Sequence, residues 1–218
     1  MIHVTNIHKY YGDLHILRGV SIDIEQGEVI SIVGPSGAGK STLLHIIGTL
    51  DRANDGKVIY EGTDVFQLSD KKLGRFRNKQ IGFVFQFHHL LPEFTAIENV
   101  SIPAHIAGMN VADTKLKAAE LLQYLGLEDR LHHKPSQLSG GEQQRVAVAR
   151  ALINDPKVVL ADEPSGNLDS DAARELHQLF FQLRKQFNQT FIIVTHNTEL
   201  ADLADRKLTM KDGTIAQH

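Results

Sequence analysis

Apolar and polar residues alternate along two stretches near the start of the chain. Residues 3–8 (HVTNIH) and 16–24 (ILRGVSIDI) have the period of two that is typical of strands with one buried face. A turn at 25–28 (EQGE) leads to 29–33 (VISIV), which is almost continuously apolar. Such a run suits a strand that is buried on both faces of a parallel sheet. The pattern thus predicts half-buried strands first and a buried strand after them.

Helical periodicity follows in three places. Residues 41–50 (STLLHIIGTL) predict a helix directly after the buried strand. Between 113 and 127 the apolar residues fall at i, i+3, i+4 and i+7, with Gly126 as the stop signal, on a face formed by Ala118, Leu121, Leu122 and Leu125. A longer helix over 172–187 is indicated by an apolar face of Ala172, Leu176, Leu179, Phe180, Leu183 and Phe187.

The remaining strands alternate with these helices. They are expected at 56–62, 81–86, 157–163 and 190–196, and a hairpin around Asp212 and Gly213 is expected within 207–218. Strands alternating with helices indicate an α/β core. The less regular stretch 87–154 reads as a helical insertion. We therefore expect a single domain over 1–218 with a helical subdomain at about 87–154.

Composition excludes some classes of function. The net charge of -3 gives no electrostatic footprint for DNA or RNA. The chain has no cysteine, so disulfides and thiolate metal sites are excluded. Its start lacks the pattern of a signal peptide, and no apolar run approaches the length of about 20 residues that a membrane helix needs. Any membrane role must then come from a partner.

The stretch 34–41 (GPSGAGKS) matches the phosphate-binding loop G-x-x-x-x-G-K-[ST] and lies between a predicted strand and a predicted helix. Its backbone N–H groups can surround phosphate oxygens at a helix N-terminus. Lys40 can reach the β- and γ-phosphates, and the Ser41 hydroxyl can ligate Mg²⁺. The alternative is a glycine-rich turn that caps a helix. The expected nucleotide-binding residues here are Gly34, Pro35, Ser36, Gly37, Ala38, Gly39, Lys40, Ser41 and Thr42.

The stretch 158–163 (VVLADE) supplies carboxylates at the end of a buried strand. Asp162 can hold Mg²⁺ beside Ser41, and Glu163 can orient and polarise the attacking water. Two adjacent acids after a strand are often only a solvated loop. Together with the phosphate-binding loop, they indicate a hydrolytic site.

The stretch 138–152 (LSGGEQQRVAVARAL) opens a helix in an unusual way. Ser139 and Glu142 have the spacing of a capping box, which by itself indicates a plain helix cap. Gly140 and Gly141 leave the first-turn amides uncovered, so this helix N-terminus could receive a second anion.

The phosphate-binding loop, LSGGE and VVLADEP together resemble the ATP-binding cassette (ABC) ATPases over essentially the whole chain. The resemblance implies an α/β P-loop NTPase fold with an antiparallel β subdomain and a helical insertion. It also implies ATP and Mg²⁺ as cofactors and a homodimer that sandwiches two ATP molecules. Ser139, Gly140 and Gly141 of one copy would then face the γ-phosphate held by the other.

Further roles come from the same resemblance. Tyr11 would stack on adenine, although the adjacent Tyr10 could be confused with it. Gln86 would sense Mg²⁺ and the attacking water, and His196 would contact the γ-phosphate. The loop that ends at Asp169 would contact the second cassette. Many members of this family have an acid directly after the histidine that corresponds to His196. This chain has Asn197 there, which leaves the local hydrogen bonding open.

The apolar stretch 85–94 (FQFHHLLPEF) is unusual for a loop. In ABC ATPases this segment receives the membrane subunits, so we expect two integral membrane subunits to dock near 87–99. The alternative is that its phenylalanines pack the insertion onto the core. The histidine pairs at 88–89 and 132–133 are poor chelates, because adjacent side chains diverge, and are expected to be loop residues.

The amino-acid sequences of this loop and of residues 41–51 resemble those of the ATPases of bacterial lipoprotein-releasing systems. That subgroup implies a peripheral ATPase at the cytoplasmic face of the bacterial inner membrane, powering lipoprotein release toward the outer membrane. The related macrolide, peptide and cell-division cassettes are the nearest alternatives. A soluble, nucleic-acid-associated ATPase is the alternative of another class, but the coiled coil or zinc module usual there is absent from this sequence.

Overall fold

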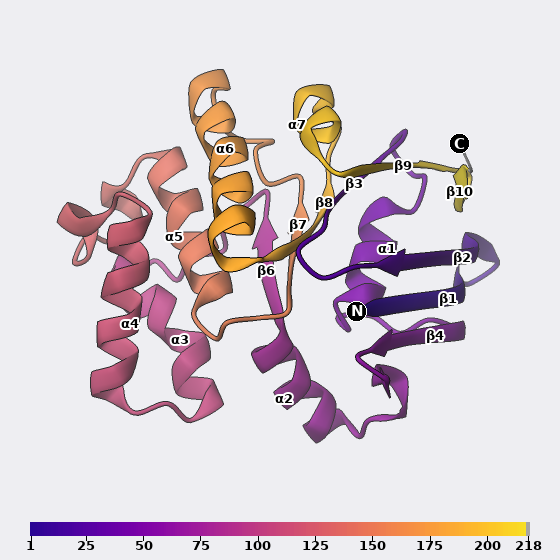
Figure 1. The fold of residues 1–218 in the computed structure, drawn as a ribbon, viewed down its shortest axis with the longest axis horizontal. Coiled ribbons are helices and arrows are strands. Elements are labelled where there is room, and N and C mark those ends of the chain that lie inside the picture. The colour runs from indigo at the N-terminus through magenta and orange to yellow at the C-terminus, as the bar shows by residue number, and fades with distance from the viewer. Residues whose placement is uncertain (217–218) are drawn as a thin grey trace. The chain divides into compact units, whose positions relative to one another are not determined.

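The computed structural model describes residues 1–216. Its contacts divide the chain into two compact units: unit 1 is Met1–Arg77 together with the chain from Leu183 onward, and unit 2 is Asn78–Gln182. Helices α2 (Asp70–Gln80) and α6 (Ser170–Phe187) each continue from one unit into the other. The fold of each unit explains where its functional residues lie (Figure 1).

Unit 1 contains an antiparallel sheet in the order β2-β1-β4-β5. The strands are β1 (Ile2–Tyr11), β2 (Leu14–Ile24), β4 (Asp55–Tyr60) and β5 (Thr63–Asp64), and the short 3-10 helix η1 (Val65–Gln67) follows them. Ile2 of β1 pairs with Ile24 of β2 on one side and with Tyr60 of β4 on the other. The alternation of buried and exposed residues along β1 confirms the half-buried strand that the sequence predicts.

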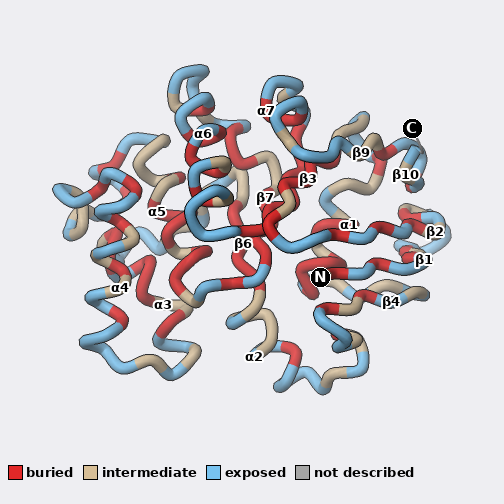
Figure 2. Tube along the Cα trace, viewed as in Figure 1, coloured by how far each residue is buried: buried red, intermediate tan, exposed pale blue. Residues whose placement is uncertain are grey.

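The second sheet of unit 1 has β3 (Val29–Val33) between β8 (Thr190–Val194) and β9 (Arg206–Lys211), both parallel to it. β10 (Thr214–Ala216) pairs with β9 and forms the expected hairpin. The hairpin was expected within 207–218, and residues 217 and 218 lie outside the described part of the chain. β3 and β8 are buried almost throughout, as their continuous apolar sequences predict (Figure 2). Helix α1 (Lys40–Ile47) packs on β8 and β2, and α7 (Thr198–Leu203) packs on β3.

Unit 2 has the parallel pair β6 (Ile81–Phe85) and β7 (Val158–Asp162). Helix α5 (Gly140–Leu152) packs on β6 and against α3 (Ala96–Ala107) and α4 (Val111–Tyr124), which lie side by side in Figure 1. The short 3-10 helices η2 (Glu128–Arg130) and η3 (Pro135–Gln137) lead from α4 to α5. Helices α3, α4 and α5 all fall within the predicted helical insertion; the boundaries 87–154 of that subdomain stay a prediction.

The structure corrects several details of the sequence reading. The helix expected at 41–50 ends at Ile47, because Gly48 caps it and Thr49 has φ 59°, which no helix continues. Phe187 is 51% exposed, so the apolar face of α6 ends before it. Helix α2 has no apolar periodicity to predict it, since Leu73 is its one fully buried residue.

Among residues 1–216, no helix combines the length and the apolar character that crossing a bilayer requires.

Candidate nucleotide site

The loop between β3 and α1 has a backbone that only glycine adopts readily. Gly34, Gly37 and Gly39 have φ of 146°, 80° and 97°. A Cβ on Gly34 would lie 2.1 Å from the carbonyl oxygen of Met210, so a side chain has no room there. A Cβ on Gly37 would meet nothing within 4 Å, which leaves that side of the loop open to a ligand. This geometry suits a phosphate cradle.

Lys40 and Ser41 begin the helix that follows this cradle. Lys40 Nζ donates to the carbonyl oxygens of Gly34 (2.9 Å) and Pro35 (3.0 Å), so the ammonium lies over the loop itself. The exposed Ser41 is in the first turn of α1, where the helix dipole favours an anion. The cationic charge and the helix N-terminus thus meet at the loop that the sequence assigns to phosphate.

The two adjacent tyrosines have different neighbours. The Tyr10 ring stacks on His15 with 4.0 Å between ring centroids and 12° between their planes. The Tyr11 hydroxyl donates to Asp51 Oδ2 at 2.7 Å, and it also interacts with the Thr42 hydroxyl. Tyr11 is therefore the tyrosine beside the start of α1, and the residue is 52% exposed.

Asp51 anchors this tyrosine together with a buried lysine. Lys9 Nζ donates to Asp51 Oδ1 (2.7 Å) and to the Arg52 carbonyl (2.8 Å), and it lies 4.9 Å from the centroid of the Tyr11 ring. The hydrogen bond to Asp51, burial and the aspartate charge raise the pKa of Tyr11. Burial alone would raise the pKa of Asp51, but hydrogen bonds from Lys9, Tyr11 and Arg52 lower it. The carboxylate thus stays charged and holds both partners.

The acidic residues lie at the carboxyl end of β7 in unit 2. The register pairs Phe85 of β6 with Asp162, so Gln86 and Glu163 leave neighbouring strands at the same edge. Glu163 has φ 47°, a conformation rare outside glycine that recurs at functional sites. The turn after it closes with a hydrogen bond from Gly166 N to the Glu163 carbonyl. The structure brings the expected glutamine and carboxylates together.

Gln86 is held by the segment that follows this turn. Its Nε2 donates to Asn167 Oδ1 at 2.9 Å, and Asn167 Nδ2 donates to the Gln86 carbonyl at 3.1 Å. A Cβ on Gly166 would lie 2.9 Å from Gln86 Nε2, so the glycine lets the glutamine approach. With the amide nitrogen engaged, Oε1 is the atom that Gln86 can offer to a metal.

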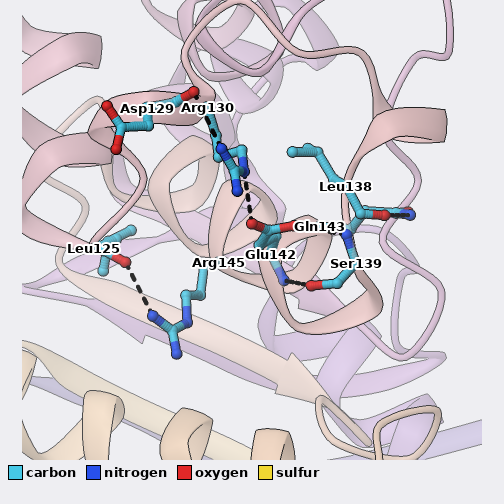
Figure 3. Close-up of polar contacts among 8 residues, drawn as sticks. All are labelled: Leu125, Asp129, Arg130, Leu138, Ser139, Glu142, Gln143 and Arg145. Atoms are coloured by element: carbon cyan, nitrogen blue, oxygen red, sulfur yellow. Dashed lines mark hydrogen bonds and ion pairs between the residues drawn. The ribbon is translucent and has the colours of Figure 1, made fainter.

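The N-terminus of α5 is a complete capping box (Figure 3). Ser139 Oγ accepts from Glu142 N at 3.2 Å, and Glu142 Oε2 accepts from Ser139 N at 2.7 Å. Arg130 Nε donates to Glu142 Oε1 at 2.9 Å. The backbone hydrogen bond from Ser139 and the Arg130 guanidinium lower the pKa of Glu142, although burial opposes them.

A pocket of about 560 Å³ lies at this helix start. Ser139, Gly140 and Gly141 line it together with Leu168 and Asp169, which come from the loop after β7. Asp169 Oδ1 accepts from Ala172 N at 2.9 Å at the start of α6. The helix start where the sequence predicts a second anion site thus borders an open pocket, and residues of the expected dimer-contact loop also line this pocket.

His196 follows β8 in unit 1 and is exposed. The next residue, Asn197, caps α7: its Oδ1 accepts from Leu200 N at 2.9 Å. Asparagine and aspartate cap helices about equally well, so the local hydrogen bonding is satisfied without the acid common among relatives.

A model of the family described as ABC transporter matches residues 17–166 of the chain. The chain belongs to this family. The dimeric ATP-binding cassette MJ0796, solved in a post-hydrolysis state bound to ADP and Pi, matches with a TM-score of 0.90 and 40% identity over 100% of this chain and 97% of that one. The expected ABC-type fold and the ABC-type ATPase are therefore confirmed.

Curated relatives are also similar over nearly their full length. The lipoprotein-releasing system ATP-binding protein LolD of Bacteroides fragilis is 60% identical, over 99% of this chain and 100% of the relative. The LolD of Bdellovibrio bacteriovorus is 53% identical, over 96% of this chain and 97% of the relative.

The apolar loop of this ABC cassette is held by its backbone. Asn99, which is fully buried, accepts from Leu91 N at 2.8 Å and donates to the carbonyls of Leu91, Phe94 and Thr95. Arg150 donates to the carbonyls of His88 and His89, at 2.7 Å each.

The side chains of Phe87, Leu91 and Phe94 in this loop are 65%, 43% and 41% exposed. The loop is fixed with its apolar side chains outward.

Both histidine pairs of the cassette lie in loops. Burial, His89 and Arg150 lower the pKa of His88. Within residues 1–216, no group of three or more His, Cys, Asp or Glu side chains gathers as a potential metal site. The Mg²⁺ expected with ATP takes hard oxygen ligands, and the hydroxyl of Ser41, the amide oxygen of Gln86 and the carboxylate of Asp162 are of that kind.

Sequence reading missed the residues that support the site. Lys9, Asp51 and Arg150 hold functional segments through contacts with residues far away in the chain. Asn99 holds the apolar loop through residues that lie four to eight positions before it. The sequence analysis gave none of the four a role of its own, although Asn99 lies within the expected docking segment 87–99 and Arg150 within the stretch 138–152.

Proposed function

We propose that this chain is the ATP-hydrolysing subunit of a lipoprotein-releasing ABC transporter at the cytoplasmic face of the bacterial inner membrane. The observation that carries the proposal is the near full-length identity to curated LolD proteins, 60% in the first of them. The macrolide, peptide and cell-division alternatives have no comparable support among these relatives.

The residues divide the work on ATP as follows. The loop from Gly34 to Thr42 binds the phosphates, with Lys40 supplying the cationic charge. Tyr11 offers a half-exposed ring to adenine, and Tyr10 is already stacked on His15. Phosphoryl transfer needs positioning and charge stabilisation more than covalent chemistry.

Mg²⁺, when bound, neutralises charge on the β- and γ-phosphates. Ser41, Gln86 and Asp162 are the residues that would hold it. Glu163 accepts a hydrogen bond from the attacking water and polarises it. His196 contacts the γ-phosphate.

A second copy of the chain completes the site. The pocket lined by Ser139, Gly140 and Gly141 offers N–H groups at a helix N-terminus, which suits the γ-phosphate bound by the other copy. The dimeric state of the MJ0796 cassette supports this arrangement.

Two integral membrane subunits dock on the segment 87–99. Its exposed Phe87, Leu91 and Phe94 form an apolar surface on a backbone that Asn99 and Arg150 hold in place. A preorganised apolar surface binds a partner without paying for the ordering of the loop. An adjacent groove of about 460 Å³, lined by Phe94, Ile97 and Ile102 among others, extends it.

The test is a pull-down from solubilised native membranes with tagged Glu163→Gln protein in the presence of ATP. Recovery of a membrane protein with few spans and a large periplasmic domain, together with lipoproteins, is the expected result. A division-site or drug-export partner would replace the cargo and keep the mechanism. Recovery of no membrane partner, or DNA-stimulated turnover, would contradict the proposal.

A further inference from the structure

The two groups assigned to the attacking water stand at the ends of neighbouring strands. Phe85 pairs with Asp162, and the next residues, Gln86 and Glu163, leave the strands there. Glu163 also has the left-handed backbone conformation, with φ 47°. The placement of both side chains therefore depends on what holds the two strand ends together.

One side-chain amide joins these strand ends. Gln144 Nε2 lies 3.2 Å from the carbonyl oxygen of Phe85 and 2.6 Å from that of Pro164. An amide NH₂ carries two hydrogens, so it can donate one to each carbonyl. One hydrogen bond thus ends directly before Gln86 and the other directly after Glu163.

The side-chain amide of Gln144 is shielded from solvent. Gln144 is fully buried, on helix α5, which packs on β6. Its Oε1 has no hydrogen-bond partner within the described part of the chain, and burying such an atom is unfavourable. A methionine of similar length would avoid that cost. What the glutamine provides in exchange is the bridge between the two carbonyls.

Gln144 belongs to helix α5, which begins within the LSGGE stretch and is named here the signature helix. Gln144 comes five residues after Ser139, whose pocket is proposed to receive the γ-phosphate of the second copy. The same rigid element therefore carries the second anion site and the amide that fixes the strand ends.

We propose that Gln144 is a positioning residue for ATP hydrolysis, which sets Gln86 and Glu163 in register through hydrogen bonds to Phe85 and Pro164. The inference rests on the proposed function, since it concerns the groups that act on ATP. A misplacement of about 1 Å at reacting groups can cost about 100-fold in rate. Loss of the bridge should consequently affect turnover and leave nucleotide binding intact.

The test compares Gln144→Met with Gln143→Met, a matched change one residue earlier. The Gln143 amide donates to the Leu138 carbonyl and is not part of the bridge. We expect Gln144→Met to lower kcat at least about tenfold with KM for ATP within about twofold of wild type, because only chemistry is disturbed. Gln143→Met should keep both values and the same Tm.

A double variant adds a readout that a merely structural role would not move. If Gln144 acts through Gln86, then Gln86→Ala with Gln144→Met should lose less activity than the product of the single losses. Gln144→Asn, whose side chain is too short to reach both carbonyls, replaces Gln144→Met if the latter is unstable. A normal kcat in a folded variant, strictly multiplicative losses, or failure of both variants to fold would overturn the inference.

Measurements of ATPase turnover in the wild-type protein distinguish a failure of this inference from a failure of the proposed function. Wild-type turnover with Mg²⁺ and ATP, and its loss in Glu163→Gln, test the ATPase itself. An inactive wild type would remove both proposals, whereas an active wild type with a fully active Gln144→Met would remove the inference alone.

Discussion

At the scale of single residues, the position of Tyr11, which we propose to stack on adenine, depends on a buried charge. Lys9 is 8% exposed and forms its ion pair with Asp51, which also accepts from the Tyr11 hydroxyl. A buried ammonium needs such a partner, because burial without one is costly. Asp51 therefore fixes the ring of Tyr11 at one edge, and the Lys9 ammonium contacts the same ring. These two contacts hold the Tyr11 ring in place, which suits the proposed stacking on adenine.

We predict that Asp51→Ala raises KM for ATP about tenfold, equal to about 1.4 kcal/mol, with kcat unchanged. Asp51→Asn should have a smaller effect, since its amide oxygen can still accept from Tyr11. Steady-state kinetics with Tyr11→Phe as the reference variant measures the share of the hydroxyl. An unchanged KM in folded Asp51→Ala would exclude this anchoring role.

At the scale of elements, helices α3 and α5 hold the apolar loop from behind. Asn99 of α3 and Arg150 of α5 donate hydrogen bonds to its backbone carbonyls, and these bonds hold the loop without using the side chains of Phe87, Leu91 and Phe94. Two explanations were open for the apolar loop, docking of a partner and packing onto the core. The exposure of Phe87, Leu91 and Phe94 favours docking. Core packing at this place is provided by buried residues such as Ile97.

Phe87→Ala should weaken binding to the membrane subunits at least about tenfold and leave Tm nearly unchanged, because its side chain is 65% exposed. Ile97→Ala, in contrast, removes a side chain that is 6% exposed and should cost about 2–5 kcal/mol of stability. Thermal unfolding and co-purification measure the two effects. Equal losses of Tm and of partner binding in Phe87→Ala would support the core-packing explanation.

At the scale of the whole molecule, the functional groups are distributed over both units. Tyr11, Lys40, Ser41 and His196 belong to unit 1, and the residues of the signature helix belong to unit 2. Each unit thus carries a helix N-terminus for which we propose phosphate binding. Two such sites in one chain agree with the proposed dimer, in which each nucleotide contacts both copies.

Glu163→Gln should form a stable dimer with ATP and hydrolyse it at least about 100-fold more slowly, since the amide cannot accept the proton of water. Size-exclusion chromatography with ATP and with ADP measures the dimer. Lys40→Ala, which loses the cation at the phosphates, is the control and should remain a monomer. A Glu163→Gln protein with near-normal turnover would exclude Glu163 as the base.

The sequence by itself determined the elements and motifs whose residues are near neighbours in the chain. The apolar run 29–33, the helix face of Ala118 and Leu122, and the cradle before Lys40 are all encoded by local spacing, and each is present in the structure. Helix α3 was only part of an irregular stretch, because Pro103 lies inside it.

Only the tertiary structure decided which polar residues support the site. Gln144 reaches carbonyls that are 59 and 20 residues away in the chain, and Lys9 reaches Asp51 across 42 residues. It also distinguished the neighbours of the two tyrosines, since Tyr10 stacks on His15 and the Tyr11 hydroxyl donates to Asp51. Such contacts have no spacing rule, because they form only when strands and helices that are distant in the chain pack together.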